Sequence, residues 1–313
     1  MTSPDSPGAL AAFSDGLADA VARVARSVVA IHARPRIPSS GVLWRDGVIV
    51  AANHTVKRDE EITVALDGGA TARASVAGRD PGTDLAVLRL DGALPPGAGA
   101  ADVGDGGALR VGHFVLAVGR PADDGVTASM GLVSALGPAW RTWAGGQIDQ
   151  FVRLDLSIYD GFSGGPLVDG RGRVVGINSS GLARGMALAV PASTVRRVVE
   201  QLLERGHVVR GYIGLGMQPV RLPAALRERV PDAGETGVMV VSVEPGGPAD
   251  RAGVLLGDIL VALDGAPVAD TEDVQAQLGP DRVGRPLAAR LIRGGAPQEA
   301  TITVGERPKR EGR

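Results

Sequence analysis

Ser163 is the residue of this sequence best placed to act as a nucleophile. It stands in the run GFSGG at positions 161–165, with glycines on both sides. A serine hydroxyl attacks a carbonyl carbon only when a neighbouring base takes its proton, and the oxyanion that forms needs backbone N–H donors held in place beforehand. Glycine suits the second need, because it adopts backbone conformations that larger residues resist. The chain must also supply the base.

Two unrelated nucleophile motifs fit these five residues, and chain order separates them. The G-x-S-x-G elbow of α/β-hydrolases requires a helix directly after the serine and a later histidine, whereas GGPLVDGRGRVVGI predicts strand, turn and strand, and only His207 follows. The G-x-S-G-G motif of chymotrypsin-like proteases requires the order His, Asp, Ser. His54 in AANHTV and Asp84 in DPGTDLAVLRL meet that order. Singly, each is typical of a strand end or a turn, but together with Ser163 they predict a catalytic triad and argue against an esterase.

The predicted triad assigns one task to each residue. His54 takes the hydroxyl proton of Ser163 and later returns it to the leaving amine, since an imidazole exchanges protons near neutral pH. Asp84 accepts the other ring N–H, which fixes the tautomer and stabilises the imidazolium. The backbone N–H groups of Gly161 and Ser163 are expected to form the oxyanion hole. This chemistry needs no metal or organic cofactor, and none is predicted.

Short strands must position these residues. From position 27 onward, apolar runs of strand length alternate with turns rich in Gly, Pro, Asp and Asn, which predicts an antiparallel barrel or sandwich. The runs are SVVAIHA, GVIVAAN, EITVAL, ASVAGR, LAVLRL, FVLAVG, GLVSAL, QFVRLDL, PLVDGRGRVVGINSS and GMALAVP. Helical spacing predicts an amphipathic helix over 9–26 and a closing helix in PASTVRRVVEQLLERG, with Ser193 or Thr194 as its N-cap and Gly206 at its end.

The length of 313 residues predicts two folding units. We expect an N-terminal helical segment at 1–26, a first domain at 27–206, a linker at 207–211, a smaller α+β domain at 212–306, and a disordered, charged tail at 307–313.

Composition and charge exclude several classes of partner and site. A formal charge of −2 leaves no basic field to attract phosphates, which argues against nucleic acid. With no cysteine, the chain can form neither a disulfide nor a thiolate metal site. No signal peptide and no apolar stretch of membrane-spanning length is visible. The sequence alone therefore favours a cytoplasmic location, unless a leader was removed upstream of Met1.

Six separated motifs, in matching order and spacing, resemble those of HtrA/DegP-type serine proteases. They are ANHTV, DPGTDLAVLRL, GHFVLAVGRP, SMGLVSALG, RLDLSIYDGFSGGPLVDGRGRVVGINSS and GMALAVPAS, and RGYIGLGMQPV with GVMVVSVEPGGPADRAGVLLGDILVALDGAPV is similar to the PDZ domain of that family. The resemblance runs from about Ser27 to Val304. It implies a mainly β protein, in which a chymotrypsin-like double β-barrel at 27–206 precedes a small α+β PDZ domain at 212–306.

The resemblance also implies an activity and partners. Members of this family are ATP-independent serine endopeptidases that degrade unfolded or misfolded proteins in protein quality control and the stress response. They are typically homotrimers built through the N-terminal segment and the protease domain, so Phe13 is expected at an interface. The family usually works outside the cytoplasm, in conflict with the absence of a visible signal peptide, so the compartment stays open.

One residue departs from the family pattern. Where the family usually has a small polar residue, commonly Asn, this chain has Phe162. The aromatic ring either packs in the activation region or biases the loop toward an oxyanion hole that is not formed. The second possibility keeps a rival open, in which a catalytically silent protein of the same fold binds peptides through its PDZ domain.

The residues beside the nucleophile predict substrate preference. Ser157 and Ile158 precede Ser163, and neither is the acidic floor that selects Arg or Lys. We expect Val, Ala, Ile or Leu before the cut bond, with about 1–3 kcal/mol of burial separating them. Asn178, Ser179 and Ser180 are expected to pair with the substrate backbone in β fashion.

A loop at the start of the second domain is the predicted site for a peptide C-terminus. The loop residues are Tyr212, Ile213, Gly214 and Leu215. A PDZ ligand adds a strand to a sheet edge and places its carboxylate in a nest of backbone N–H groups, for which glycine is suited. Val274 and Leu278 either line the pocket for the last side chain or form the ordinary core of a short helix.

Overall fold

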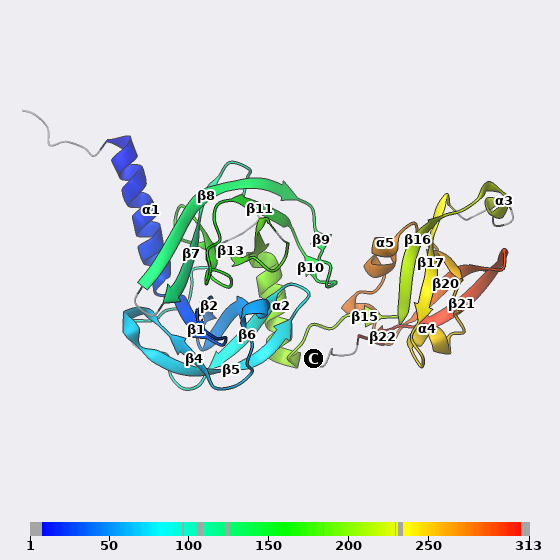
Figure 1. Cartoon of the computed structure of the whole chain (residues 1–313), viewed down its shortest axis with the longest axis horizontal. Helices are drawn as coiled ribbons and strands as arrows, with labels where there is room; N and C mark the ends of the chain where they lie inside the picture. The colour runs from blue at the N-terminus through cyan, green and yellow to red at the C-terminus, as the bar shows by residue number, and fades with distance from the viewer. Residues whose placement is uncertain are drawn as a thin grey trace, which may run out of the picture. The chain divides into compact units, whose positions relative to one another are not determined.

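The computed structural model describes residues 8–95, 97–104, 109–122, 125–183, 185–228, 230 and 234–307. The chain divides into two compact units between Val208 and Val209 (Figure 1). Residues 1–7 of the expected N-terminal segment lie outside the described residues. So does the expected tail, apart from Arg307.

The first unit contains two closed antiparallel barrels of six strands each. In the first barrel the strand order is β1-β2-β3-β6-β5-β4, and in the second it is β11-β14-β13-β12-β7-β8. The first is built from β1 (Val28–His32), β2 (Ser39–Arg45), β3 (Val48–Ala52), β4 (Ile62–Ala65), β5 (Thr71–Asp80) and β6 (Leu85–Leu90). The second is built from β7 (Phe114–Ala122), β8 (Gly125–Gly137), β11 (Phe151–Asp155), β12 (Pro166–Asp169), β13 (Val174–Ser179) and β14 (Ala187–Pro191). The expected mainly β, double-barrel fold is confirmed.

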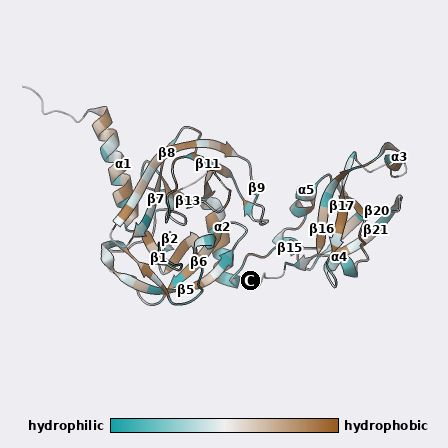
Figure 2. Cartoon of the chain, in the orientation of Figure 1, coloured by the Kyte–Doolittle hydropathy of each residue, from teal (hydrophilic) through white to brown (hydrophobic). Residues whose placement is uncertain are grey.

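Burial of apolar side chains holds the barrels closed and together. Within each barrel, apolar residues recur along the strands (Figure 2), and β3 is buried along its whole length. A further cluster joins the barrels and includes Val50, Val118, Ile177 and Val198. Each such aliphatic side chain contributes about 1.5–3 kcal/mol when it leaves water. The two barrels therefore meet in a packed, apolar contact.

Two helices flank the barrels. α1 (Ala9–Ala25) buries only Ala20 and Val24, while Phe13 is 41% exposed and contacts the ring of Phe114 at a centroid distance of 5.2 Å. α2 (Ala192–Arg205) buries its apolar face against both barrels. No helix among the described residues is long and apolar enough to cross a membrane.

The ends of α2 confirm one sequence prediction and correct another. Gly206 ends the helix with φ 74°, as predicted, because glycine adopts this left-handed conformation without strain. The predicted N-cap was wrong, because Pro191 occupies that position and no side chain caps the helix. Thr194 lies inside the first turn, where its hydroxyl accepts the N–H of Asp149 at 2.8 Å, and Ser193 is exposed beside it.

The second unit is an antiparallel sheet with short helices, and five strands form its main order. Its order is β16-β17-β18-β20-β21, so β16 is an edge strand, and β19 pairs with β18. The strands are β15 (Gly211–Tyr212), β16 (Leu215–Arg221), β17 (Thr236–Val243), β18 (Ile259–Leu263), β19 (Ala266–Pro267), β20 (Pro286–Arg293), β21 (Ala296–Thr303) and β22 (Gly305–Glu306), and the helices are α3 (Ala224–Arg227), α4 (Pro248–Arg251) and α5 (Thr271–Ala276). This small α+β unit matches the expected fold class.

A buried carboxylate ties the start of β18 to the end of the neighbouring strand β20. Asp258 is 1% exposed and accepts hydrogen bonds from Nε and Nη2 of Arg293 at 2.8 and 2.7 Å and from the N–H of Leu255 at 2.8 Å. Burial acts to raise the pKa of Asp258, but the bonds from Arg293 and Leu255 outweigh it and hold that pKa below its ordinary value.

The lowered pKa gives a pH-dependent stability. Because the folded-state pKa of Asp258 lies below the unfolded one, the carboxylate stabilises the fold above the unfolded pKa, and this contribution is lost as pH falls through the folded pKa. Asp258→Asn should lower the free energy of unfolding of the second unit by about 2 kcal/mol at neutral pH.

Calorimetry of the full chain over a pH series measures the effect. Trp44, Trp140 and Trp143 all belong to the first unit. A calorimetric transition that is not accompanied by a change in tryptophan fluorescence is therefore the unfolding of the second unit. The difference between wild type and Asp258→Asn should shrink in acid. A difference that stays constant with pH contradicts the assignment.

Candidate active site

His54 lies on a short 3-10 turn, η1 (Asn53–Thr55), directly after β3. The guanidinium of Arg79 supports this turn, since it donates to Oδ1 of Asn53 at 3.3 Å and to the carbonyl of Val56 at 2.8 Å. The His54 side chain remains 34% exposed. The end of a buried strand thus presents an imidazole to solvent from a fixed backbone.

Asp84 ends a tight turn that leads into β6. The Asp80 carboxylate accepts the N–H of Gly82 at 3.1 Å and the hydroxyl of Thr83 at 2.7 Å, which shapes the turn. Asp84 itself has φ 58°, a left-handed conformation that costs a non-glycine residue about 1 kcal/mol. Its carbonyl is held by the N–H of Asn53 at 2.9 Å. Strain at this position is thus supported by neighbouring contacts.

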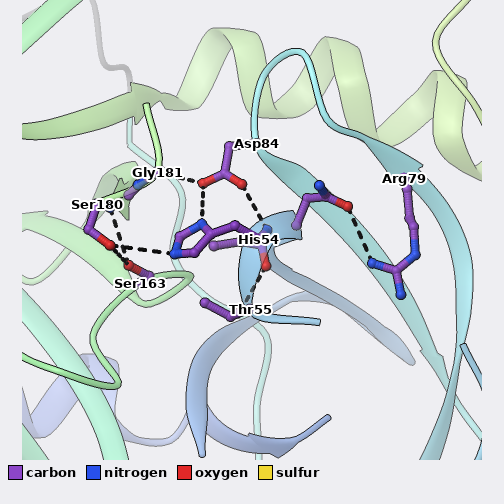
Figure 3. Close-up of polar contacts among 10 residues, drawn as sticks. His54, Thr55, Arg79, Asp84, Ser163, Ser180 and Gly181 are labelled. Atoms are coloured by element: carbon purple, nitrogen blue, oxygen red, sulfur yellow. Dashed lines mark hydrogen bonds and ion pairs between the residues drawn. The ribbon is translucent and has the colours of Figure 1, made fainter. Parts of the chain in front are cut away.

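The Asp84 carboxylate receives three hydrogen bonds (Figure 3). Oδ1 accepts the backbone N–H of His54 at 2.9 Å, and Oδ2 lies 2.7 Å from His54 Nδ1. The Ser179 hydroxyl donates to the same Oδ2 at 2.5 Å. Because a carboxylate only accepts, the contact assigns the proton to Nδ1 and leaves Nε2 as an acceptor. The sequence-predicted pair His54 and Asp84 is therefore brought together in the orientation that a general base requires.

Ser163 lies on the open side of the imidazole, with a third hydroxyl between the two. Its Oγ is 2.9 Å from Oγ of Ser180 and accepts the Ser180 N–H at 3.2 Å. Ser180 Oγ in turn lies 3.4 Å from His54 Nε2. Among the hydrogen bonds of the described residues, none joins Ser163 directly to His54. The three residues of the predicted triad lie in one place, with the Ser163 hydroxyl turned toward Ser180 in this conformation (Figure 3).

The predicted oxyanion loop, Gly161 to Ser163, has a left-handed glycine at its start. Gly161 has φ 88°, and a Cβ there would lie 2.7 Å from Cβ of Pro121, so only glycine fits. Within the described part of the chain, neither the Gly161 nor the Ser163 N–H donates to a protein acceptor. Two backbone donors are thereby left for a ligand oxygen.

Phe162 points into the protein. It is 0% exposed and meets Tyr159 edge-to-face at a centroid distance of 5.4 Å. The absence of a side chain on Gly119 makes room for the ring, because a Cβ there would lie 2.8 Å from it. This arrangement agrees with the first interpretation of Phe162, as a packed residue.

The structure changes the picture for the expected substrate contacts. Asn178 is fully buried: its N–H and amide nitrogen donate to Gly165 and Pro166, and its carbonyl accepts the N–H of Gly164. These contacts occupy the backbone N–H and backbone carbonyl of Asn178, which corrects the expectation that it pairs with a substrate backbone. Ser157 is exposed and Ile158 is half-buried beside the nucleophile loop.

Two contributions around Asp84 were missed by the sequence reasoning. The Ser179 hydroxyl, expected near substrate, holds the carboxylate instead. Gly181 packs so closely that a Cβ would lie 2.7 Å from His54 Nδ1 and 2.9 Å from Asp84 Oδ2. The sequence did contain one signal, the run of small residues Ser179-Ser180-Gly181 after an apolar strand. Such a run indicates that another segment packs closely against it, but it does not identify that segment.

In the second unit, the predicted carboxylate loop joins β15 to β16. The carbonyls of Ile213 and Gly214 accept the N–H groups of Ala249 and Glu244, both at 2.9 Å. In the described residues, the Ile213 and Gly214 N–H groups donate to no loop or turn acceptor. Gly214 has φ 77°, and Tyr212 and Leu215 flank it, both half-buried.

The two residues proposed as either pocket or core are both buried. Val274 is 0% exposed and Leu278 is 6% exposed, and both belong to the apolar core of the second unit. This favours the interpretation of an ordinary helix core, with α5 packed near the edge strand β16.

Comparison with known families and proteins gives one consistent result. A trypsin-like peptidase domain family matches residues 39–177, and a PDZ domain family matches residues 211–304. A probable periplasmic serine endoprotease, DegP-like, of Brucella suis is 37% identical over 90% of this chain and 55% of its own length. The putative serine protease HhoB of Synechocystis is 30% identical over 88% of this chain and 68% of its own length. The chain spans about half the length of the Brucella relative.

Solved structures agree over nearly the whole chain. The HtrA-type protease AlgW with a decapeptide matches with a TM-score of 0.75 and 30% identity, over 93% of this chain and 99% of that one. A serine endoprotease from Yersinia pestis matches with a TM-score of 0.73 and 29% identity, over 98% of this chain and 100% of that one.

The expected cytoplasmic location is wrong by this comparison. The DegP-like relatives from Brucella and from Rhizobium meliloti are named periplasmic endoproteases. The expectation rested on the absence of a visible leader, and that absence carries little weight beside similarity over most of the chain.

The hydroxyl between Ser163 and His54 leads to a prediction. Ser180→Ala removes it and keeps the Ser180 N–H, so Ser163 should bond directly to His54 Nε2 more of the time. One neutral hydrogen bond changes such an equilibrium roughly two- to tenfold, and a fluorophosphonate probe should label Ser163 faster by about that factor. The second-order labelling rate measures this, with Ser180→Thr, which keeps the hydroxyl, as control. Slower labelling of Ser180→Ala would mean that the hydroxyl assists proton transfer instead.

Proposed function

Because this chain belongs to the HtrA/DegP family of trypsin-like serine proteases with a PDZ domain, we propose that it is an ATP-independent serine endopeptidase that cuts unfolded or misfolded proteins. The observation that carries the proposal is the Asp84 carboxylate, held by Ser179 and bonded to His54 Nδ1 at 2.7 Å, with Ser163 on the other side of the imidazole. That arrangement supports nucleophilic catalysis of acyl transfer.

The reaction starts with a rotation of the nucleophile. Ser163 Oγ leaves Ser180 and turns to His54 Nε2, a change between staggered rotamers. The hydroxyl proton then passes to Nε2 while Oγ bonds to the substrate carbonyl carbon, and the carbonyl oxygen becomes an oxyanion. The contact of Asp84 with Nδ1 stabilises the imidazolium.

The oxyanion would be stabilised by the unpaired N–H groups of Gly161 and Ser163. Collapse of the intermediate breaks the C–N bond, and His54 gives its proton to the leaving amine. Water then attacks the acyl-enzyme and passes a proton to His54. The bond between the acyl carbon and Ser163 Oγ breaks, and His54 returns the proton to Oγ. Each donor to the oxyanion is worth on the order of a hundredfold in rate.

The rival proposal, a catalytically silent binding protein, loses its main support in Phe162. A ring that is buried against Tyr159 and Gly119 occupies interior space and leaves the two N–H donors open. The rival makes a different prediction for proteolysis, which the first experiment below decides.

We propose that the substrate side chain before the cut bond binds beside Ser157 and Ile158. Neither residue carries a charge, so we expect an uncharged pocket. Ser179 and Ser180 remain candidates for backbone pairing with a substrate, since Ser179 is the last residue of β13 and Ser180, which follows it, contacts Ser163.

The second unit is proposed to bind peptide C-termini at the loop Tyr212 to Leu215. Among the described residues the N–H groups of Ile213 and Gly214 have no acceptor, and β16 is an edge strand; both features support a carboxylate nest beside an added strand. The solved structure of the HtrA-type protease AlgW with a decapeptide is consistent with peptide recognition in this family.

We further propose that the protein is a homotrimer. The support is the exposed apolar side of α1, where Leu10 is 81% and Phe13 41% exposed, and where Phe13 packs on Phe114. Apolar side chains presented in a group are characteristic of protein interfaces.

Proteolysis of unfolded casein is the first test. Wild type should degrade it without ATP, and Ser163→Ala should lose about 10⁶ in turnover, since removal of a triad serine removes the covalent step. Ser193→Ala, an exposed serine on α2, is the matched control and should behave as wild type. If wild type and Ser163→Ala degrade casein equally slowly, the silent binding protein becomes the better proposal.

Peptides that differ only before the cut bond test the pocket. Val, Ala, Ile and Leu should give kcat/KM values roughly 5- to 150-fold above Arg and Lys, because an uncharged pocket gains from apolar burial and leaves a cation without a partner. Mass spectrometry of the products locates the cut. Cleavage mainly after Arg or Lys contradicts the pocket assignment.

A further inference from the structure

Ser40 bridges the two barrels at the back of the candidate oxyanion hole. It lies on β2 of the first barrel and is 0% exposed. Its N–H and its hydroxyl both donate to the carbonyl of Gly161 in the second barrel, at 2.8 and 2.6 Å. One buried residue thus supplies two donors to the carbonyl of Gly161, whose own N–H has no acceptor among the described residues.

The direction of the Ser40 hydroxyl is determined by a third contact. Its Oγ accepts the backbone N–H of Arg120 at 2.8 Å. A hydroxyl has one proton, so with its oxygen occupied by the Arg120 N–H, it can direct that proton to Gly161. Arg120 is itself fixed, because its buried guanidinium donates to Val28 and Asp67.

The carbonyl of Gly161 and its N–H belong to the same residue, so they are related by φ and ψ alone. Because the carbonyl is held against β2, the N–H can change direction only through a rotation about φ, which is 88°, or ψ of Gly161. If the peptide after Gly161 turned over, the Ser40 N–H and hydroxyl would both be buried without a partner, which is unfavourable.

Space around Ser40 agrees with a close and specific contact. A Cβ on Gly119 would lie 2.9 Å from Ser40 Oγ, and one on Gly165 would lie 3.1 Å from Ser40 Cβ. These glycines let β2 approach the nucleophile loop. Hydrogen bonds of this length then form without a water molecule between the barrels.

We propose that Ser40 is a positioning residue that holds the oxyanion loop in its donor-outward conformation, acting through the Gly161 carbonyl. This rests on the proposed protease function. Ser40 touches no reacting atom. Its hydroxyl makes the loop ready before substrate arrives, so that the N–H of Gly161 need not reorganise when the oxyanion forms.

The adjacent residue offers a matched control. Ser39 is also on β2 and also 0% exposed, but its hydroxyl has no hydrogen-bond partner among the described residues. Ser39→Ala and Ser40→Ala thus remove the same atom from neighbouring buried sites. Only the second removes a contact to Gly161.

Hydrogen exchange tests the positioning itself, whether or not the protein cuts peptides. In the full-length, ligand-free protein, mass spectrometry should show faster exchange of the peptide covering 156–166 in Ser40→Ala, and wild-type exchange in Ser39→Ala. Exchange in Ser40→Ala equal to that in wild type would overturn the proposal while leaving the protease function untouched.

Kinetics tests the consequence for catalysis. After active-site titration, Ser40→Ala should lower kcat about 10-fold with KM within twofold, a smaller loss than removal of a donor, because the Ser40 N–H remains. The Ki of a peptidyl trifluoromethyl ketone, whose ionised hemiketal occupies the oxyanion hole, should rise by the same factor. Ser39→Ala should change neither.

Ser40→Cys covers the case in which Ser40→Ala does not fold, since the thiol fills the space but donates weakly. It should reproduce the fall in kcat. A rise in KM with kcat unchanged, in either variant, contradicts a role in the transition state. Absence of proteolysis by wild type would instead overturn the proposed function, and the exchange measurement would still decide whether Ser40 holds the loop.

Discussion

The Asp84 carboxylate is the contact on which the geometry of the site depends. Its three donors come from both barrels: His54 contributes its backbone N–H and ring Nδ1 from the end of β3, and Ser179 contributes its hydroxyl from the end of β13. A buried carboxylate without donors would be costly, so the barrels must meet in the register that brings these groups together. The hydrogen bonds that join one barrel to the other at Asp84 therefore also set the orientation of the imidazole.

Glycine makes that meeting possible at close range. A side chain on Gly181 would enter the space of His54 and Asp84, one on Gly161 would meet Pro121, and one on Gly119 would meet Phe162. The last of these explains how this chain accommodates an aromatic residue next to its nucleophile. The ring takes the volume that a side chain at position 119 would fill, and it stabilises the loop through burial rather than through a polar contact.

The sequence predicted what depends on order and pattern. The order His54, Asp84, Ser163, the short apolar runs and the domain succession led to the fold and to the candidate triad, because local pattern and chain order both determine them. It missed what depends on contacts between distant segments: the hydroxyl of Ser179 on Asp84, the engagement of Asn178 with the turn after Ser163, and Ser180 beside Ser163. A small polar residue after a strand indicates an approach, but its partner comes from another part of the chain.

The same lesson applies to helix ends. Ser193 and Thr194 have the residue types of an N-cap, yet Pro191 occupies the N-cap position of α2, and the Thr194 hydroxyl is used by the N–H of Asp149 from another segment. Local preference is worth about 1 kcal/mol, and a buried hydrogen bond to a distant backbone group is worth as much. A tertiary contact can therefore give a residue a different role from the one that its type alone predicts.

Both units use one physical device to present backbone donors. Gly161 and Gly214 have φ of 88° and 77°, and the carbonyl of each is bound by the protein, that of Gly161 by Ser40 and that of Gly214 by the N–H of Glu244. Binding the carbonyl fixes the peptide plane that follows, and among the described residues the N–H groups of Gly161 and Gly214 themselves have no acceptor. Such groups favour a negatively charged oxygen, either an oxyanion or a terminal carboxylate. The proposed oxyanion hole and the proposed carboxylate site would thus use the same residue type. They differ in what stands beside them: an imidazole in the first unit and the edge strand β16 in the second.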